Sequence, residues 1–210
     1  RDIRAATRAM HHIMLAHGSA MDVLRSHGQK NLGIVLNLGH GEPASDSTAD
    51  IAATKTYDAI AFRWFMDSLF KGHYPGDMIT AVQQHMPQGY EEDLARIAQP
   101  LDWLGINYYT RALIQATPTD PWPHFVETPG PLPKTQMGWE IYPEGLEMLL
   151  KRVHTEYTGE LPLMVTENGM ANDDSVTNGR CDDPVRVKYF DDHLQAVLKC
   201  IADGVPMKGY

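Results

Sequence analysis

The sequence has little cysteine, no long hydrophobic run and fewer cationic than anionic residues. Its 2 cysteines, Cys181 and Cys200, cannot form a disulfide framework, and no Cys-x-x-Cys spacing indicates a metal site. No stretch approaches the ~20 apolar residues of a membrane-spanning helix, so the chain is not expected to cross a membrane. The 18 Lys and Arg against 27 Asp and Glu give a net charge of −9. This acidic balance argues against nucleic acid as a partner, because such binding needs clustered cations.

Sequence signatures of common cofactor and metal sites are also missing. There is no Gly-x-Gly-x-x-Gly turn or P-loop, no Gly-x-Ser-x-Gly nucleophile elbow and no EF-hand spacing. The histidines near the N-terminus are His11, His12, His17 and His27. None of them form an i, i+4 pair, so we interpret them as buried or surface side chains and not as metal ligands. We therefore expect neither a metal nor a cofactor.

What the sequence does contain is a repeated order of helices and strands. Residues 3–24, 50–70, 144–157 and 184–203 are typical of helices, and 33–37, 103–109 and 163–167 of strands, with the start of a further strand at 205–210. This order predicts a parallel sheet with helical crossovers. A doubly wound open sheet and a (β/α)8 barrel, which needs ~250 residues, both fit this pattern. Periodicity alone does not choose between them.

Three local features carry more specific predictions. Residues 110–138 lack periodicity and hold 6 prolines, so they are expected to form a long loop. Asp77 is predicted to cap a short helix that runs to Gln84. In the last helix, the apolar residues are predicted to face the core; they are Val187, Phe190, Leu194, Val197, Leu198 and Ile201. Asp183 is predicted to cap the start of that helix.

The sequence patterns at the two ends of the chain resemble interrupted secondary structure. Arg1 stands directly before a helical pattern, and Val205 to Tyr210 resemble a strand that does not continue. We therefore expect an internal piece of a longer polypeptide. A targeting segment would then lie upstream of Arg1, so the sequence assigns no cellular compartment.

Polar side chains stand at the ends of the three complete predicted strands. These are Asn37, Asn107 with Tyr109, and Glu167. In a parallel sheet the three ends share one edge, and in a barrel this edge carries the active site. A carboxylate that closes an apolar run is costly to bury without a partner. Glu167 alone would be expected to begin a solvated loop, but polar groups on three neighbouring ends favour a functional site.

Thr166-Glu167-Asn168-Gly169, directly after an apolar strand, resembles the nucleophile signature of the family 1 glycoside hydrolases, the β-glucosidase family. Further matching stretches follow in the expected order along essentially the whole chain. They are Asn37 followed by Pro43-Ala44-Ser45, Arg63 to Asp67, Gly72 to Pro75, Gly105 to Tyr109, Gly138 to Pro143, and the helix after Arg186. The resemblance implies an α/β protein with a (β/α)8 barrel, of which residues 1–210 are the carboxyl-side half. This half would run from the helix after strand four to the start of strand eight.

The same resemblance implies a retaining β-glycosidase, specifically a β-glucosidase that works without a cofactor. Its substrates would be small β-glucosides or cello-oligosaccharides, as in cellulose degradation. Such an enzyme needs two carboxyl groups ~5–5.5 Å apart. Glu167 matches the nucleophile, and Tyr109 matches the tyrosine that donates a hydrogen bond to it. From its position alone, Tyr109 is equally compatible with an aromatic residue that packs in the core.

Four further residues match the wall of the sugar site in that family. Asn107 matches a polar residue of the wall, although an Asn at this point more often caps the next turn. Trp139 matches the tryptophan that can stack on the aglycone, with a core position as its alternative. Asn37 and His40 are assigned to the entrance of the site.

The acid/base Glu of the family belongs to an Asn-Glu-Pro motif that would precede residue 1. Glu42-Pro43 is the only Glu-Pro pair in the chain, but it follows another strand and Gly41 replaces the Asn. We therefore do not assign Glu42 as the acid, and we expect the remaining half of the barrel to be a required partner. Alternatives are a non-catalytic sugar-binding or scaffold barrel and a transglycosylase with the same site. Glucose, galactose and fucose are not distinguished.

Overall fold

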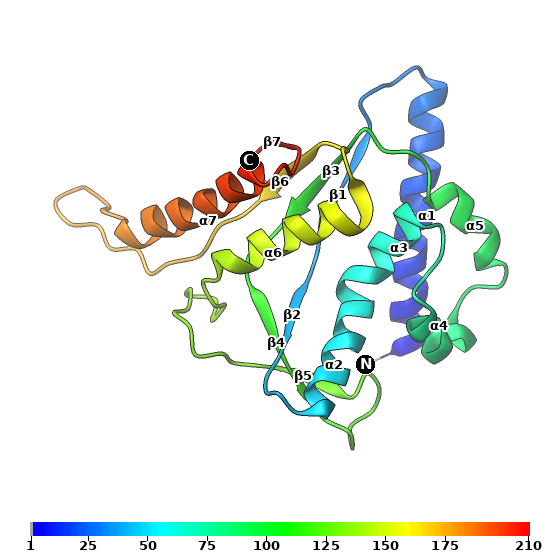
Figure 1. Cartoon of the computed structure of the whole chain (residues 1–210), viewed down its shortest axis with the longest axis horizontal. Helices are drawn as coiled ribbons and strands as arrows, with labels where there is room; N and C mark the ends of the chain where they lie inside the picture. Colours follow the sequence, from blue (N-terminus) through cyan, green and yellow to red (C-terminus); the bar gives the residue numbers. More distant parts are fainter. Residues whose placement is uncertain (1) are drawn as a thin grey trace.

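A four-stranded parallel sheet forms the centre of the computed structural model, which describes residues 2–210 (Figure 1). Its strands lie side by side in the order β1 (Gly33–Asn37), β3 (Trp103–Asn107), β6 (Leu163–Glu167) and β7 (Met207–Gly209). Every neighbouring pair is parallel, so the carboxyl ends of all four strands lie at one edge. The predicted parallel sheet is confirmed.

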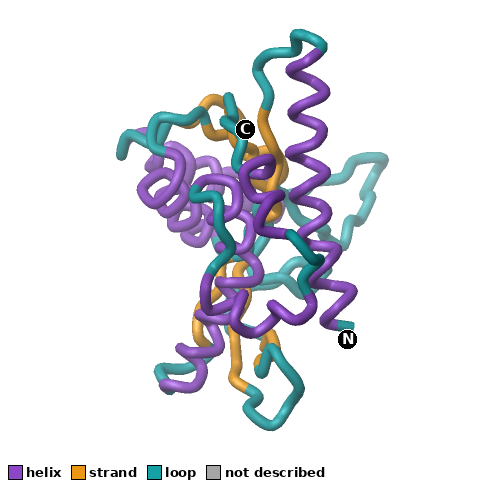
Figure 2. The backbone as a smooth tube through the Cα atoms, turned by 90° about the vertical axis from the view of Figure 1, so that its right-hand side faces the viewer, coloured by secondary structure: helices purple, strands orange, loops and turns teal. Residues whose placement is uncertain are grey.

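Helices connect the successive strands, as a parallel arrangement requires. α1 (Ile3–Ser26) precedes β1. Between β1 and β3 lie four helices, α2 (Thr48–Asp58), α3 (Trp64–Phe70), α4 (Gly76–Val82) and α5 (Tyr90–Ile97). α6 (Pro143–Val153) follows β3, and α7 (Pro184–Ala202) follows β6. In Figure 2 the chain climbs along α1, turns at its far end and runs back as β1. The side chain of Asp183 accepts a hydrogen bond from the Arg186 amide at 3.2 Å, which confirms the predicted cap of α7.

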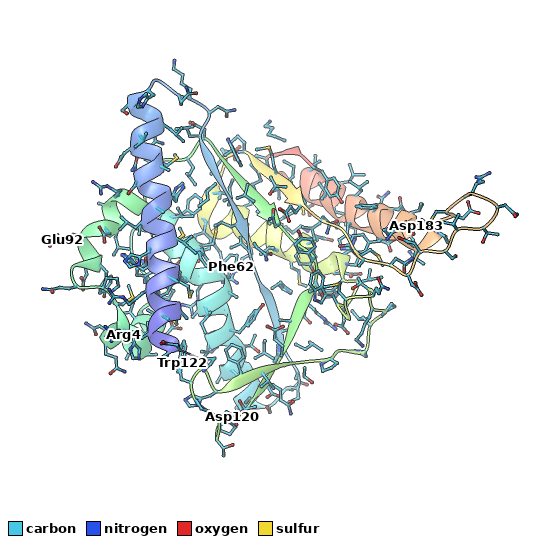
Figure 3. All side chains as sticks on the ribbon, turned by 180° about the vertical axis from the view of Figure 1, so that it is seen from behind. Arg4, Phe62, Glu92, Asp120, Trp122 and Asp183 are labelled. Carbon is cyan, nitrogen blue, oxygen red and sulfur yellow. The ribbon has the colours of Figure 1, made fainter. Side chains whose placement is uncertain are left out.

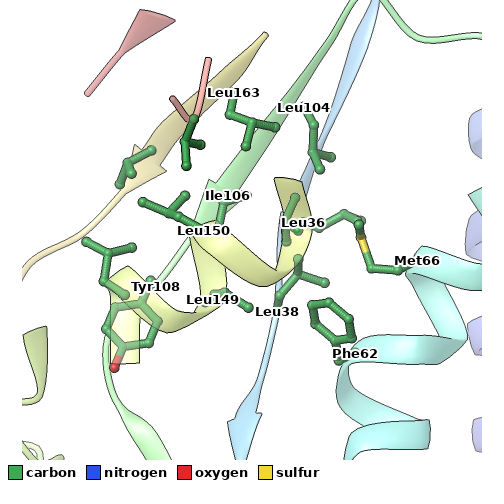
Figure 4. Packing of buried hydrophobic residues seen from close by; sticks show 14 of the residues in the cluster. Leu36, Leu38, Phe62, Met66, Leu104, Ile106, Tyr108, Leu149, Leu150 and Leu163 are labelled. Atoms are coloured by element: carbon green, nitrogen blue, oxygen red, sulfur yellow. The ribbon is translucent and has the colours of Figure 1, made fainter. Parts of the chain in front are cut away.

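One face of the sheet packs against α3, α6 and neighbouring helices. Leu104 and Ile106 of β3 are fully buried, and they belong to the same cluster as Leu149 and Leu150 of α6 and Phe62. Figure 4 shows these side chains converging between the strands and α6. Burial of each such side chain contributes about 1.5–3 kcal/mol. This packing fixes the strands, and with them the edge where the polar side chains stand.

The other face of the sheet is open within the described residues. Figure 3 shows it from behind, with β1 and β3 lying in front of α3 and α6. Val35, whose side chain alternates with the buried Leu36, is 43% exposed on this face. The open face therefore leaves an apolar side chain uncovered within the described residues.

The predicted helix over residues 50–70 is broken by a π-helical turn, η1 (Ala59–Arg63), between α2 and α3. A π-helical turn adds a residue and shifts the buried face of the helix. Phe62 in this turn, and Trp64 and Met66 directly after it, are fully buried. A 3-10 turn, η2 (Gln83–His85), follows α4, and a second π-helical turn, η3 (His154–Thr158), follows α6.

The loop predicted over residues 110–138 contains two strands, so that prediction is wrong in part. β4 (Arg111–Ala116) pairs in parallel with β2 (His40–Pro43) and antiparallel with β5 (Phe125–Thr128). The 6 prolines all lie after β4 or flank β5, where they do not remove a ladder donor. This small sheet extends from the carboxyl edge of the main sheet (Figure 1).

The prediction for Asp77 is wrong in position, although its carboxylate does accept a hydrogen bond from a backbone amide of the first turn, that of Met78 at 3.0 Å. α4 has Pro75 at its N-cap with no side-chain cap, and Asp77 lies in the first turn instead. There its carboxylate accepts hydrogen bonds from Arg63 at 2.6 and 3.1 Å. The ion pair joins α4 to the end of η1.

The predicted inward face of α7 is mostly an outer face. Val187 is 68% exposed and Leu198 is 55% exposed, and Leu194 and Ile201 lie on the same exposed stripe. The buried residues of α7 are Tyr189, His193, Ala196, Val197 and Cys200. α7 therefore has two apolar faces, one packed on α6 and one uncovered.

Candidate active site

The polar residues that end the three predicted strands are brought side by side. Asn37 of β1 is in register with Asn107 of β3, and Asn107 is in register with Glu167 of β6. All three lie at the carboxyl edge of the sheet. The predicted cluster at this edge therefore exists in the folded chain.

An irregularity in β6 determines where Glu167 points. β3 and β6 pair regularly up to Ile106 and Val165, but the next β3 residue, Asn107, pairs with Glu167. Thr166 is thus an extra residue, as in a β-bulge. If β6 alternated regularly through Thr166, Glu167 would face the helix side, as Leu163 and Val165 do. The bulge brings Glu167 beside Asn107 instead.

Thr166 is held on the open face by its own contacts. Its hydroxyl donates a 2.7 Å hydrogen bond to Oδ1 of Asn107. A Cβ on Gly105 would lie 2.7 Å from Cγ2 of Thr166, so only glycine leaves room for this side chain. Asn107 therefore stabilises the bulge, and it does not cap a turn.

Tyr109 is the direct partner of Glu167. Its hydroxyl donates a hydrogen bond to Oε2 of Glu167. This bond, together with burial and the negative charge of Glu167, raises the pKa of Tyr109 above its ordinary value. The tyrosine consequently stays protonated and acts as a donor to a carboxylate. Glu167 is exposed, but it stands at the strand tips beside Asn107 and Tyr109 and not on the outer surface of the helices.

Trp139 completes an aromatic wall at this edge. Its ring centroid lies 5.6 Å from that of Tyr109, with the ring planes inclined at 50°. Trp139 is 39% exposed, so it is not a core tryptophan. A cavity of about 570 Å³ lies beside it, and its lining includes Asn37, Tyr57, Tyr109, Arg111 and Trp139. Tyr109 thus contacts Glu167 and also lines a cavity large enough for a small ligand.

His40 does not join this group. It is the first residue of β2, and its Nε2 lies 3.1 Å from Oε1 of Glu42. Its ring centroid is 6.3 Å from that of Tyr142. It belongs to a neighbouring ion-pair cluster and is not among the residues that line the cavity.

That cluster centres on Arg111, which the sequence reasoning missed. Arg111 donates to Oε2 of Glu42 at 2.5 Å and to Oε2 of Glu140 at 2.8 Å, and its guanidinium lies 4.4 Å from the centre of the Tyr142 ring. Its place two residues after Tyr109 was the only sequence signal. Because Glu140 follows Trp139 in the chain, the cluster anchors the segment that carries this tryptophan.

The charge of Arg111 also sets the ionisation of its partners. Burial opposes ionisation of Glu42, but hydrogen bonds from Tyr142 and His40 and the Arg111 charge outweigh it and lower the pKa of Glu42. The pKa of Glu140 is lowered in the same way, against burial, by Arg111 and by the Leu132 amide. Glu42 is therefore a paired carboxylate, which is the opposite of what a proton donor near neutral pH requires.

Other titratable clusters offer no metal site within residues 2–210, since no three His, Cys, Asp or Glu side chains converge there in a suitable arrangement. His11 is fully buried, and its two ring nitrogens face Tyr74 at 2.9 Å and Asp93 at 3.2 Å.

None of the helices in the described part of the chain is long and apolar enough to cross a membrane.

Comparisons with known proteins show which family the chain resembles. The family model described as Glycosyl hydrolase family 1 matches residues 1–210. Beta-glucosidase A of Thermotoga maritima is 38% identical over 214 residues, and the match covers 100% of this chain and 47% of that protein. A beta-glucosidase of Agrobacterium sp. is 40% identical over 215 residues, covering 100% and 46%. The structure titled beta-glucosidase from Thermotoga maritima in complex with deoxynojirimycin aligns with a TM-score of 0.93 at 37% identity, covering 100% of this chain and 48% of that one.

The chain therefore spans about half the length of the curated relatives it matches. Its parallel sheet and covering helices form about half of a (β/α)8 barrel, as the resemblance predicted.

Proposed function

The chain belongs to glycosyl hydrolase family 1, and on that premise we propose that it is part of a retaining β-glucosidase that hydrolyses terminal β-D-glucosyl residues. The observation that carries the proposal is the carboxylate of Glu167, which stands at the carboxyl edge of the sheet with Tyr109 as its hydrogen-bond donor. In a barrel this edge is where catalytic side chains gather.

In the proposed reaction, Glu167 attacks the anomeric carbon and displaces the aglycone oxygen. A covalent glycosyl-enzyme forms, and the departing oxygen takes a proton from an acid/base Glu outside this chain. Water then attacks the same carbon, gives its proton to that Glu, and releases Glu167 and a sugar of retained configuration. Tyr109 orients the nucleophile through the hydrogen bond that it donates to Oε2 of Glu167.

Trp139, Asn107 and Asn37 would contact the substrate. The partly exposed face of Trp139 suits stacking on a sugar or aryl group, and Asn37 lies in the lining of the cavity beside it. The proposed substrates are small β-glucosides or cello-oligosaccharides. Two carboxyl groups suffice for this chemistry, so the mechanism uses no metal or cofactor. His40 is proposed to act only through Glu42, its hydrogen-bond partner.

Covalent labelling of the complete enzyme tests the proposal. An aryl 2-deoxy-2-fluoro-β-glucoside should inactivate it and add one fluoroglucosyl group to the peptide that contains Glu167, as read by mass spectrometry. Glu42→Gln serves as the matched control, because it removes the charge of a neighbouring carboxylate that is paired with Arg111, and it should leave labelling at Glu167. Labelling of a different residue would remove the assignment, and sugar binding without labelling would favour a non-catalytic sugar-binding barrel.

We further propose that β1, β3, β6 and β7 are strands five to eight of the barrel and that α1 is the helix after strand four. The outer strands β1 and β7 then pair with the remaining half. The exposed stripe on α7, Val187, Leu194, Leu198 and Ile201, would pack against a helix of that half.

The 210-residue polypeptide alone is expected to be inactive and poorly soluble. Its sheet has two outer strands and an uncovered face, which favour association. Light scattering and glucosidase assays of this polypeptide, with and without the co-expressed other half, measure the effect. Activity should appear only with both halves. A monodisperse, cooperatively melting and active preparation of residues 1–210 would contradict the proposed half-barrel.

A further inference from the structure

Beyond the bulge in β6, the backbone carbonyl of Tyr108, directly after β3, takes its donor from a side chain. Past Thr166, the Tyr108 amide donates a 3.0 Å hydrogen bond to the carbonyl of Glu167. A regular parallel ladder would next supply a backbone N–H from β6 to the carbonyl of Tyr108. That carbonyl instead accepts from the side chain of Asn168, with Nδ2 at 2.8 Å. A side-chain amide therefore continues the ladder directly beyond Glu167.

The amide of Asn168 is fixed at both of its ends. The same nitrogen donates to the hydroxyl oxygen of Tyr189 at 2.9 Å, and Oδ1 accepts from the hydroxyl of Tyr210 at 2.9 Å. Since the Tyr108 carbonyl can only accept, the nitrogen of the amide must face it. Every bond of the amide thus has a definite direction, and its rotamer is set.

These partners come from elements that lie far apart in the sequence. Tyr108 follows β3, Tyr189 belongs to α7, and Tyr210 follows β7. Tyr189 is 1% exposed, and its ring stacks on that of His193 with 3.9 Å between centroids. Burial raises the pKa of Tyr189 to about 12, so its hydroxyl is neutral. A rigid, buried support therefore stands behind Asn168.

We propose that Asn168 is a positioning residue for Glu167, one that holds the bulged end of β6 so that the carboxylate meets the anomeric carbon. The inference rests on the proposed nucleophilic role of Glu167. Asn168 touches no reacting atom; it acts through the backbone that it shares with Glu167. Loss of the amide frees the peptide that carries the nucleophile, and a misplacement of 1 Å costs about 100-fold in rate.

The test compares variants of the complete enzyme. In Asn168→Ala, kcat and the rate of labelling by an aryl 2-deoxy-2-fluoro-β-glucoside should fall together by about 10- to 100-fold. Inhibition by glucose, which reports ground-state binding, should not change. Tyr210→Phe removes only the hydrogen bond to Oδ1 and should shift both rates in the same direction by a smaller factor. Tyr157→Phe is the matched control, because it removes one hydroxyl bond, to Asp67 at 2.8 Å, outside the site.

Wild-type kcat and labelling in folded Asn168→Ala would overturn the proposal. If that variant does not fold, Tyr210→Phe decides, and unchanged rates in this variant would equally overturn it. A wild-type enzyme that is not labelled at Glu167 would instead overturn the proposed function, so the two failures are distinguishable.

Discussion

Replacement of Glu167 by glutamine in the complete enzyme is expected to lower kcat for an aryl β-glucoside by about 10³- to 10⁶-fold, as loss of a covalent nucleophile does in other enzymes. The amide has the size of the carboxylate but no charge with which to attack the anomeric carbon. Tyr109 remains in place as a donor, because the amide oxygen still accepts. Substrate affinity should therefore change far less than turnover.

Chemical rescue separates loss of the nucleophile from loss of the fold. In Glu167→Ala, sodium azide can attack from the side that the carboxylate occupied, so the product should be the α-glucosyl azide. Glu156→Gln is the matched control, since Glu156 is a surface residue paired with Arg152 at 3.1 Å. It should keep wild-type turnover and show no response to azide. Near-normal turnover in Glu167→Gln would contradict the central assignment.

Arg111→Met is expected to lower the free energy of unfolding by about 3 kcal/mol at neutral pH, within the range for breaking a buried ion pair. The variant leaves Glu42 and Glu140 without their shared cation. The side chain of Glu140 is only 6% exposed, whereas that of Glu42 is 27% exposed and can regain water. Most of the cost therefore falls on Glu140. Urea unfolding of the complete protein measures it.

The effect of Arg111→Met should depend on pH in a definite direction. The pKa values of Glu42 and Glu140 are lowered in the folded state, so their contribution is present above the ordinary glutamate value of 4.5 and is lost as the pH falls through the folded values. The difference between wild type and variant should shrink as the pH falls below 4.5.

Arg180→Met is the control for that prediction, because Arg180 is 82% exposed and lies 3.8 Å from Asp182. Such a surface pair contributes about 0–1 kcal/mol. An equal loss of stability in both variants, or a difference that does not depend on pH, would contradict the role of the Arg111 cluster.

Local periodicity was sufficient to predict the main strands and helices but not the small sheet. The apolar runs at 33–37 and 163–167 coincide with β1 and β6. β4 was missed because its partner β2 pairs Arg111 with His40, about 70 residues earlier in the chain, and no local pattern records such a pairing. In α7, two apolar faces share one helix, so periodicity could not decide which face packs on α6.

The candidate site, too, could be predicted only in part from local sequence patterns. Polar strand ends and the family resemblance indicated Glu167 and Tyr109, whose contact joins residues 58 positions apart. The bulge at Thr166 could not be predicted, because the register depends on the partner strand β3. Neither could the Arg111 cluster, since each of its three charged residues lies in a different segment.

The bulge at Thr166 also separates the residues of β6 that pack in the core from those at the candidate site. Leu163 and Val165 face the helices, and the two residues that follow face the opposite side, with one peptide as the boundary. Mutational libraries that aim at higher thermal stability can therefore vary Leu163 and Val165 without changing Thr166 or Glu167. Deletion of Thr166 would place the glutamate directly after Val165, where regular alternation keeps it on the open face, but the deletion removes the hydrogen bond that Thr166 donates to Asn107.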